Sequence, residues 1–243
     1  MNLSDRNYAS LFLDGAAIFL LIGMIIHTTI YRRRGRINDR LFFSMLITDI
    51  LMACSDMAVA IANGESFAGA RVMNLLGESL YYITMGVFAF LVVLFLYYRL
   101  VEDEKRYKKM RTILMIPITL VELMYLIGVP NGLFISVDAD NNYHFAKLYF
   151  LPVAIMGLYV IAALYLSLIY KAKMGKVKHI PLWIYLIPMV GIYLPFFVEM
   201  AAMTPMMIAV CIAYMHMGIM NEQFFSLEEK TAEGDSQKGG AKS

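Results

Sequence analysis

The sequence predicts an all-α membrane protein, a seven-transmembrane helix bundle with its amino terminus outside the cell and its carboxyl terminus in the cytoplasm. Of its 243 residues, 60% are apolar and 16% are charged, and the mean hydropathy is +0.64. An ordinary soluble domain has fewer apolar residues and about 25% charged ones. The apolar residues gather in membrane-length stretches, and basic residues gather in alternate connecting segments. These patterns exclude a soluble globular chain.

The apolar stretches define the predicted spans and domains. An α-helix rises about 1.5 Å per residue, so about 20 residues cross the hydrocarbon core. The stretches that meet this length are 10–31, 41–63, 72–98, 112–129, 148–170, 181–200 and 203–220. The first is expected to stay in the mature protein, because arginines follow it where a signal peptide would have a small-residue cleavage site. Residues 1–220 then form the membrane domain, and 221–243 form a cytoplasmic helical exit with a disordered tail.

The orientation follows from the basic residues between the spans. Three alternate segments are strongly basic, and they carry Arg32, Arg33, Arg34, Arg36 and Arg40, then Arg99, Lys105, Arg106, Lys108, Lys109 and Arg111, then Lys171, Lys173, Lys176 and Lys178. The segments on the other side carry only Arg6, Arg71 and Lys147. Because Lys and Arg accumulate in cytoplasmic loops, the basic side is predicted to face the cytoplasm.

The segment 130–147 is predicted to form an extracellular β-hairpin between spans four and five. Residues 132–137 and 143–145 have the pattern of short strands, and 138–142 is rich in the turn formers Asp and Asn. A plain connector is one interpretation. A cap over the bundle is the other, and it better explains Phe134 and Tyr143, which need apolar cover. The cap predicts that one of these rings is buried and that the turn is exposed.

Acidic residues inside the spans are the candidate ligand-binding site, because an ionisable group in hydrocarbon is costly unless it is neutralised, paired or facing a cavity. The carboxyl groups are those of Asp14, Asp56, Glu78 and Glu122, each predicted to lie roughly 7–11 Å below the outer edge, with Glu199 near the top of span six. If they converge, they either share protons or hold a cation. The alternative is that each acid is a lone, protonated hydrogen-bonding group between helices.

Tyrosine hydroxyls are predicted at the same level. Tyr81 and Tyr82 lie one turn below Glu78, and Tyr125 lies on the same face as Glu122. Carboxylates and tyrosines together suit a cationic or polyhydroxylated small molecule.

Enzymatic activity is not expected. Asp49 and Asp56 are one heptad apart on one helix, which separates them by roughly 10 Å, too far for the shared proton of an aspartyl protease. His27 and His216 both lie near the cytoplasmic ends of their spans, where a hydrogen-bonding pair is a better interpretation than a metal site. Span seven has no lysine for a retinal Schiff base. No cofactor and no metal are expected.

Span six contains a candidate hinge. Pro188, Gly191 and Pro195 interrupt its backbone hydrogen bonds, which kinks a membrane helix. A static bend is the alternative interpretation.

Two stretches carry a resemblance to a known family. The stretch INDRLFFSMLITDILMACSDMAVAI, with Asn38, Phe42 and Asp56, and the hairpin LFISVDADNNYHFAKLYFLP are similar to the seven-transmembrane sensory region that precedes diguanylate cyclase or histidine kinase domains in many Firmicutes. The resemblance covers about residues 5–230 and includes the helical exit NEQFFSLEEK. It implies that a signal at the outer face moves the last spans. Residues after Lys230 resemble neither output enzyme, so we expect either a separate output protein or a remnant that has lost its output.

The predicted function is therefore a sensor or receptor-like module in a bacterial cell membrane, passing an extracellular signal to the cytoplasm. Its expected partners are the lipid bilayer, an extracellular small molecule or cation, and a cytoplasmic signalling protein or a second copy of the chain, with no nucleic acid. A small-solute or cation transporter and a structural membrane protein without ligand are the alternatives.

Overall fold

The computed structural model describes residues 5–31, 37–101, 103–174 and 203–217. Five long helices follow one another in this part of the chain, namely α1 (Asp5–Tyr31), α2 (Ile37–Ala62), α3 (Ala70–Val101), α4 (Glu104–Gly128) and α5 (Phe150–Met174). All five are long and apolar enough to cross a membrane, and a shorter apolar helix spans Thr204–Met217. Spans one to five are thus confirmed as long apolar helices. The predicted span at 181–200, with the proposed hinge, the last residues of the predicted span 203–220 and the predicted tail 221–243 lie outside the described residues.

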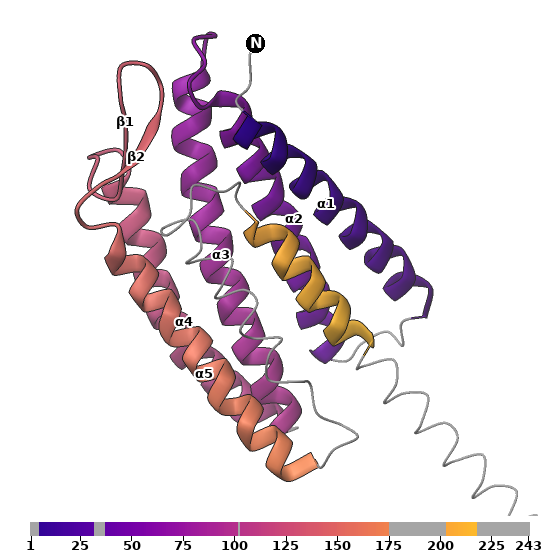
Figure 1. Cartoon of the computed structure of the whole chain (residues 1–243). Helices are drawn as coiled ribbons and strands as arrows, with labels where there is room; N and C mark the ends of the chain where they lie inside the picture. Colours follow the sequence, from indigo (N-terminus) through magenta and orange to yellow (C-terminus); the bar gives the residue numbers. More distant parts are fainter. Residues whose placement is uncertain (1–4, 32–36, 102, 175–202, 218–243) are drawn as a thin grey trace, which may run out of the picture.

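The helix α3 is the centre of the bundle. It packs against α2, α4 and α5, while α1 packs against α2 (Figure 1). Every side chain from Leu91 to Leu96 is buried, so this part of α3 is covered on all sides. A helix that is apolar all round is expected in such a position.

Two glycines of α3 allow its neighbours to approach closely. A Cβ at Gly77 would lie 2.7 Å from Cγ2 of Val59 and 3.1 Å from the carbonyl oxygen of Ser55, both on α2. A Cβ at Gly86 would lie 2.6 Å from Cδ1 of Ile118 on α4. Small residues at helix contacts are the usual means of close packing in membranes.

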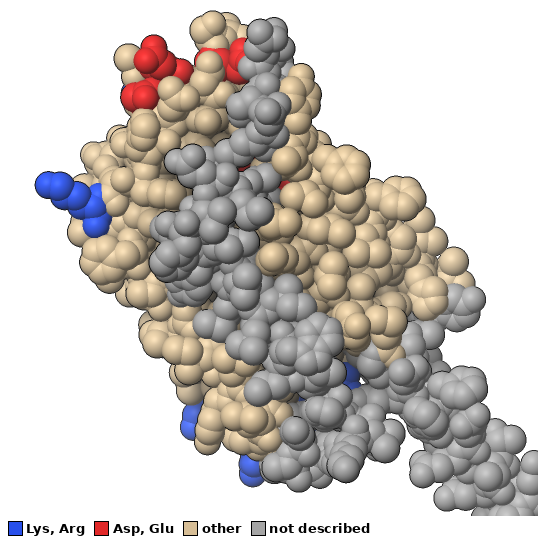
Figure 2. All heavy atoms as spheres, in the orientation of Figure 1, with Lys and Arg blue, Asp and Glu red and all other residues tan. Residues whose placement is uncertain are grey.

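The helix α4 begins earlier than its apolar stretch suggests. Asp103 caps it, because a carboxylate oxygen accepts hydrogen bonds from the backbone N–H groups of Lys105 at 2.8 Å and Arg106 at 3.2 Å. The basic segment predicted as a loop before span four is therefore largely the first turns of α4. Figure 2 shows several basic side chains at this end of the bundle, acidic ones at the opposite end, and further basic side chains on the flank below the hairpin.

The predicted hairpin is present between α4 and α5. Strands β1 (Ile135–Val137) and β2 (Tyr143–Phe145) pair antiparallel, with Ile135 opposite Phe145 and Val137 opposite Tyr143. The first strand is shorter than the predicted 132–137. Phe134 is buried, as the cap interpretation requires, but the turn is not wholly exposed, because Asn141 is buried.

Candidate functional site

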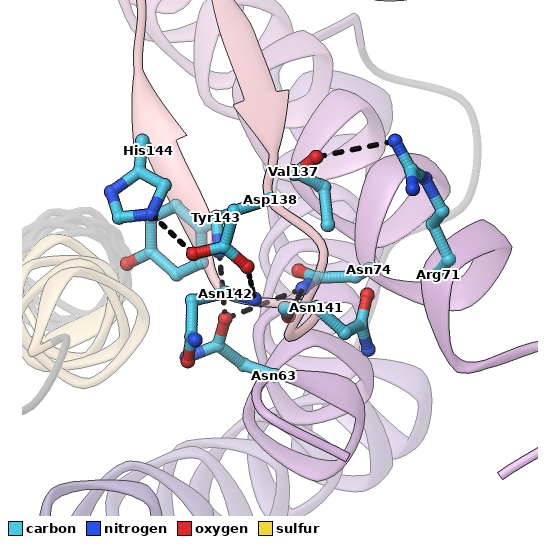
Figure 3. Close-up of polar contacts among 9 residues, drawn as sticks. All are labelled: Asn63, Arg71, Asn74, Val137, Asp138, Asn141, Asn142, Tyr143 and His144. Carbon is cyan, nitrogen blue, oxygen red and sulfur yellow. Dashed lines mark hydrogen bonds and ion pairs between the residues drawn. The ribbon is translucent and has the colours of Figure 1, made fainter. Parts of the chain in front are cut away.

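The turn of the hairpin is hydrogen-bonded to the end of the α2–α3 pair (Figure 3). Asn141 adopts a left-handed conformation, with φ of 63°, which asparagine tolerates better than most residues. Its side-chain amide donates to the carbonyl oxygens of Ala62 at 2.7 Å and Glu65 at 3.0 Å. Its own carbonyl oxygen accepts from the backbone N–H of Gly64 at 3.0 Å. One turn residue thus provides hydrogen-bond partners for backbone groups at the carboxyl end of α2 and in the loop that follows it.

Two asparagines complete this contact from the helix side. The amide of Asn74, on α3, donates to the carbonyl oxygen of Asn141 at 2.9 Å and to Oδ1 of Asn63 at 3.3 Å. The same Oδ1 of Asn63 accepts from the backbone N–H of Tyr143 at 3.0 Å. We call Asn63, Asn74 and Asn141 the asparagine lock. Arg71 adds a bond to the carbonyl oxygen of Val137 at 3.2 Å.

The turn is also stabilised within itself. One carboxylate oxygen of Asp138 accepts from the backbone N–H of Asn142 at 2.8 Å, and the other lies 2.9 Å from Nε2 of His144 (Figure 3). The hydrogen bond from His144 and then the backbone bond from Asn142 lower the pKa of Asp138 below its usual value. The hairpin is therefore built to keep this carboxylate ionised.

A layer of aromatic rings lies beneath the hairpin. Tyr82 of α3 stacks on Tyr125 of α4 with ring centroids 5.6 Å apart, and Tyr125 contacts Phe134 at 5.6 Å. Tyr149, just before α5, donates a hydrogen bond from its hydroxyl to that of Tyr82. The layer joins α3, α4 and the start of α5, and all four rings are buried.

Glu78 is the acidic member of this layer. Its carboxyl is buried and acts electrostatically on Tyr81, Tyr82 and Tyr125. Glu122 does not join it: this residue is half-buried on α4 and acts on Tyr159 of α5.

A second acidic group lies between α1 and α2. Asp14 and Asp49 are fully buried, and Asp56 is 9% exposed. The carboxyl groups of Asp14 and Asp56 lie within hydrogen-bonding range of each other, and Asp49 acts electrostatically on Asp14. We call Asp14, Asp49 and Asp56 the aspartate group. Tyr81 connects it to the aromatic layer, because its hydroxyl is under the influence of both Asp56 and Glu78.

The predicted ligand-binding residues therefore divide into sets. Asp14 and Asp56 come together with Asp49, which was not predicted to join them. Glu78, Tyr81, Tyr82 and Tyr125 come together around the aromatic layer. Glu122 acts on Tyr159 and is not among the groups that act on these three tyrosines, and Glu199 lies outside the described residues.

The predicted histidine pair forms. Nε2 of His216 lies 2.9 Å from Nδ1 of His27, and the His216 ring stacks on Phe42 of α2 at 5.3 Å. Beside the pair is a groove of about 550 Å³. It is lined by Phe19, Leu20, Gly23, Met24, His27, His216 and Met217. None of the predicted ligand-binding residues in the described part of the chain lines this groove.

Sequence reasoning missed the asparagine lock. Asn63 and Asn74 lie at the ends of apolar stretches, where asparagine is ordinary, and their bonding partners are distant in the sequence. The available signal was the presence of asparagine at the end of predicted span two, near the start of predicted span three and again in the hairpin turn. Comparisons with models of protein families and with curated proteins give no match to this chain.

Proposed function

We propose that the chain is a membrane sensor or receptor-like module of seven spans, with the hairpin outside the cell and the carboxyl terminus in the cytoplasm. In this proposal the input lies at the outer end. It consists of the hairpin, the aromatic layer with Glu78, and the aspartate group. The last two spans form the output.

The observation that carries the proposal is the position of the Thr204–Met217 helix. At its start, Thr204 shares a side-chain hydrogen bond with Tyr81, the residue that lies between Glu78 and the aspartate group. Further along, Cys211 lies within the electrostatic influence of Asp49. Near its end, His216 contacts His27. The helix therefore contacts the polar interior along its length, so a change of charge there acts on it directly.

The attachment of the hairpin to the helices supports the same proposal. The asparagine lock ties the hairpin to α2 and α3, while the chain itself ties it to α4 and α5. A bound ligand or a change of charge near Glu78 then meets four helices that are joined at one end. Such joined elements respond as a unit, as a conformational switch requires.

A test separates the sensor from the transporter alternative. The only tryptophan, Trp183, lies in the predicted sixth span and serves as a built-in fluorescent reporter. The protein is placed in sealed liposomes that contain a pH-sensitive dye, and the external medium is stepped from about pH 7 to about pH 9, so that a buried acid that is protonated at neutral pH releases its proton. External sodium chloride is the second probe.

The sensor predicts a change in Trp183 emission without faster internal alkalinisation than in protein-free liposomes. Asp56→Asn should abolish the emission change, and Asp140→Asn, at an exposed turn position, should leave it intact. Internal alkalinisation that requires the protein would favour a transporter. No emission change with either probe would contradict a sensor of protons or cations.

A further inference from the structure

The aspartate group has the features of a site for one particular ligand. Asp14 is contributed by α1, and Asp49 and Asp56 by α2, at the contact between these two helices. Asp14 and Asp49 are 0% exposed. In the described part of the chain, neither oxygen of Asp14 receives a bond from an N–H or O–H donor. The carboxyl group of Asp14 nevertheless lies within hydrogen-bonding range of the carboxyl group of Asp56. Two carboxyl groups form a hydrogen bond with each other only if one of them carries a proton.

Among the described residues, none of the groups that act on Asp14 carries a positive charge. The charged groups that act on Asp14 from the described residues are Asp56 and Asp49. From α3, Tyr81 faces Asp56 and is also influenced by Glu78, and from the Thr204–Met217 helix Cys211 faces Asp49. Every one of these groups is either acidic or a neutral hydroxyl or thiol. Two like charges that share a buried site favour protonation of one of them.

The buried carboxyl group of Asp49 supports the site independently. Both of its carboxyl oxygens are buried, and neither has a hydrogen-bond partner among the described residues. An unpaired carboxylate inside hydrocarbon is strongly disfavoured, whereas the neutral acid is tolerated. The chemistry of this position is therefore that of an acid that takes up a proton.

A metal ion fits the same residues less well. A metal site would need several oxygen, nitrogen or sulfur ligands around one point. The described residues contain no group of three or more His, Cys, Asp or Glu side chains arranged to hold such an ion. A shared proton needs only the two carboxyl groups of Asp14 and Asp56.

We propose that Asp14, Asp49 and Asp56 form an intramembrane proton-binding site. One proton is shared between the carboxyl groups of Asp14 and Asp56, and a second resides on Asp49. Both protons come from water and return to water, with no other bond made or broken. This inference rests on the proposed function in that it names the sensor's input, but the site can be measured without a signalling assay.

Release of these protons would alter the bundle in a defined place. Loss of the shared proton leaves two carboxylates facing each other across the α1–α2 contact, and repulsion then separates the helices. Loss of the proton on Asp49 places a charge beside Cys211 on the Thr204–Met217 helix. The site thus has contact with the element assigned to the output.

The test is infrared spectroscopy of the protein in lipid nanodiscs. Protonated carboxyl groups absorb separately from carboxylates, and ¹³C-labelled aspartate shifts only the bands of aspartate. At neutral pH the wild-type protein should show a protonated aspartate band that responds to the label. Asp14→Asn and Asp56→Asn should each remove the shared-proton part, Asp49→Asn should remove a separate part, and Asp140→Asn should remove neither.

The labelled wild-type protein needs no variant to fold, so it decides the first question by itself. Absence of a protonated aspartate band at neutral pH would overturn the site. So would a band that survives all three substitutions in variants that retain the wild-type circular dichroism. Loss of the band on addition of sodium chloride would assign the site to a metal cation instead. If the band is present but Trp183 fluorescence ignores pH, the proton site stands and the sensor fails.

Discussion

The side-chain amide of Asn74 donates to the backbone carbonyl of Asn141 across 2.9 Å, which joins α3 to a turn 67 residues later in the chain. Both residues are buried, so water does not replace this bond easily. The contact holds the hairpin over the aromatic layer and therefore sets the shape of the proposed input.

Removal of this amide should loosen the hairpin. Asn74→Ala deletes the bonds to Asn141 and Asn63, and we expect a loss of about 1–3 kcal/mol in the free energy of unfolding, since buried polar atoms are left without partners. Thermal unfolding in a fixed detergent measures it. Asn131→Ala is the control, because this exposed amide makes a local bond to the carbonyl of Ile127. Equal losses in the two variants would contradict the lock.

Asn141 is expected to matter through both its amide and its backbone. Asn141→Gly removes the amide bonds but keeps the positive φ at no steric cost, whereas Asn141→Ala also strains the left-handed backbone. The alanine variant should therefore be less stable than the glycine variant by about 1–2 kcal/mol. The comparison uses the same thermal unfolding assay. A glycine variant as unstable as the alanine variant would show that backbone strain contributes nothing here.

Asp138 should make the hairpin sensitive to acid. Its pKa is lowered in the folded protein by His144 and by the backbone of Asn142. A lowered folded pKa stabilises the fold above the ordinary value of 3.8, and this stabilisation is lost as the pH falls through the folded value. The unfolding temperature of Asp138→Asn should be below that of the wild type at about pH 6, and the difference should disappear as the pH falls below the folded pKa of Asp138.

The control for this pH dependence is Asp140→Asn, at an exposed position of the same turn. Its difference from the wild type should stay small at every pH. A deficit of Asp138→Asn that does not change with pH would assign its effect to packing instead of charge.

The histidine pair should couple the first helix to the last described one. His27→Ala and His216→Ala should each destabilise the protein, and the double variant should lose less than the sum, with a coupling of about 0.5–1.5 kcal/mol. Unfolding of the four proteins in the cycle measures this quantity. Thr29→Ala combined with His216→Ala should be additive, because the exposed Thr29 hydroxyl makes a local bond, to the carbonyl of Ile25, among the described residues. A coupling near zero between His27 and His216 would contradict a stabilising contact between them.

The helices and the hairpin were predictable because their signals are local. Apolar length defines a membrane helix, and β-branched and aromatic residues around an Asp- and Asn-rich turn define a hairpin. The meeting of His27 and His216 was predictable because both lie at similar depths in apolar helices. Burial of Phe134 followed from its apolar character next to a polar turn.

The arrangement of the acids was predictable only in part. Depth in the membrane follows from residue counting, so Asp14 and Asp56 were rightly placed at one level. The direction of a side chain around its helix depends on which helices pack together, and this is a property of the whole bundle. For this reason Glu122 acts on Tyr159 and not on the tyrosines around Glu78, and Asp49 acts on Asp14. The asparagine lock depends on partners far apart in the chain and leaves no periodic signal.

Orientation of the hairpin is the central claim, because the input can meet an extracellular signal only if this end faces outward. Single cysteines are introduced as Asp140→Cys in the turn and Lys105→Cys at the start of α4, in a protein with Cys54→Ser and Cys211→Ala. Intact cells are then treated with a membrane-impermeant maleimide. We expect labelling at position 140 in intact cells and at position 105 only after permeabilisation, as the basic segments predict. Labelling at position 105 in intact cells, with position 140 protected until permeabilisation, would contradict an outward-facing sensor.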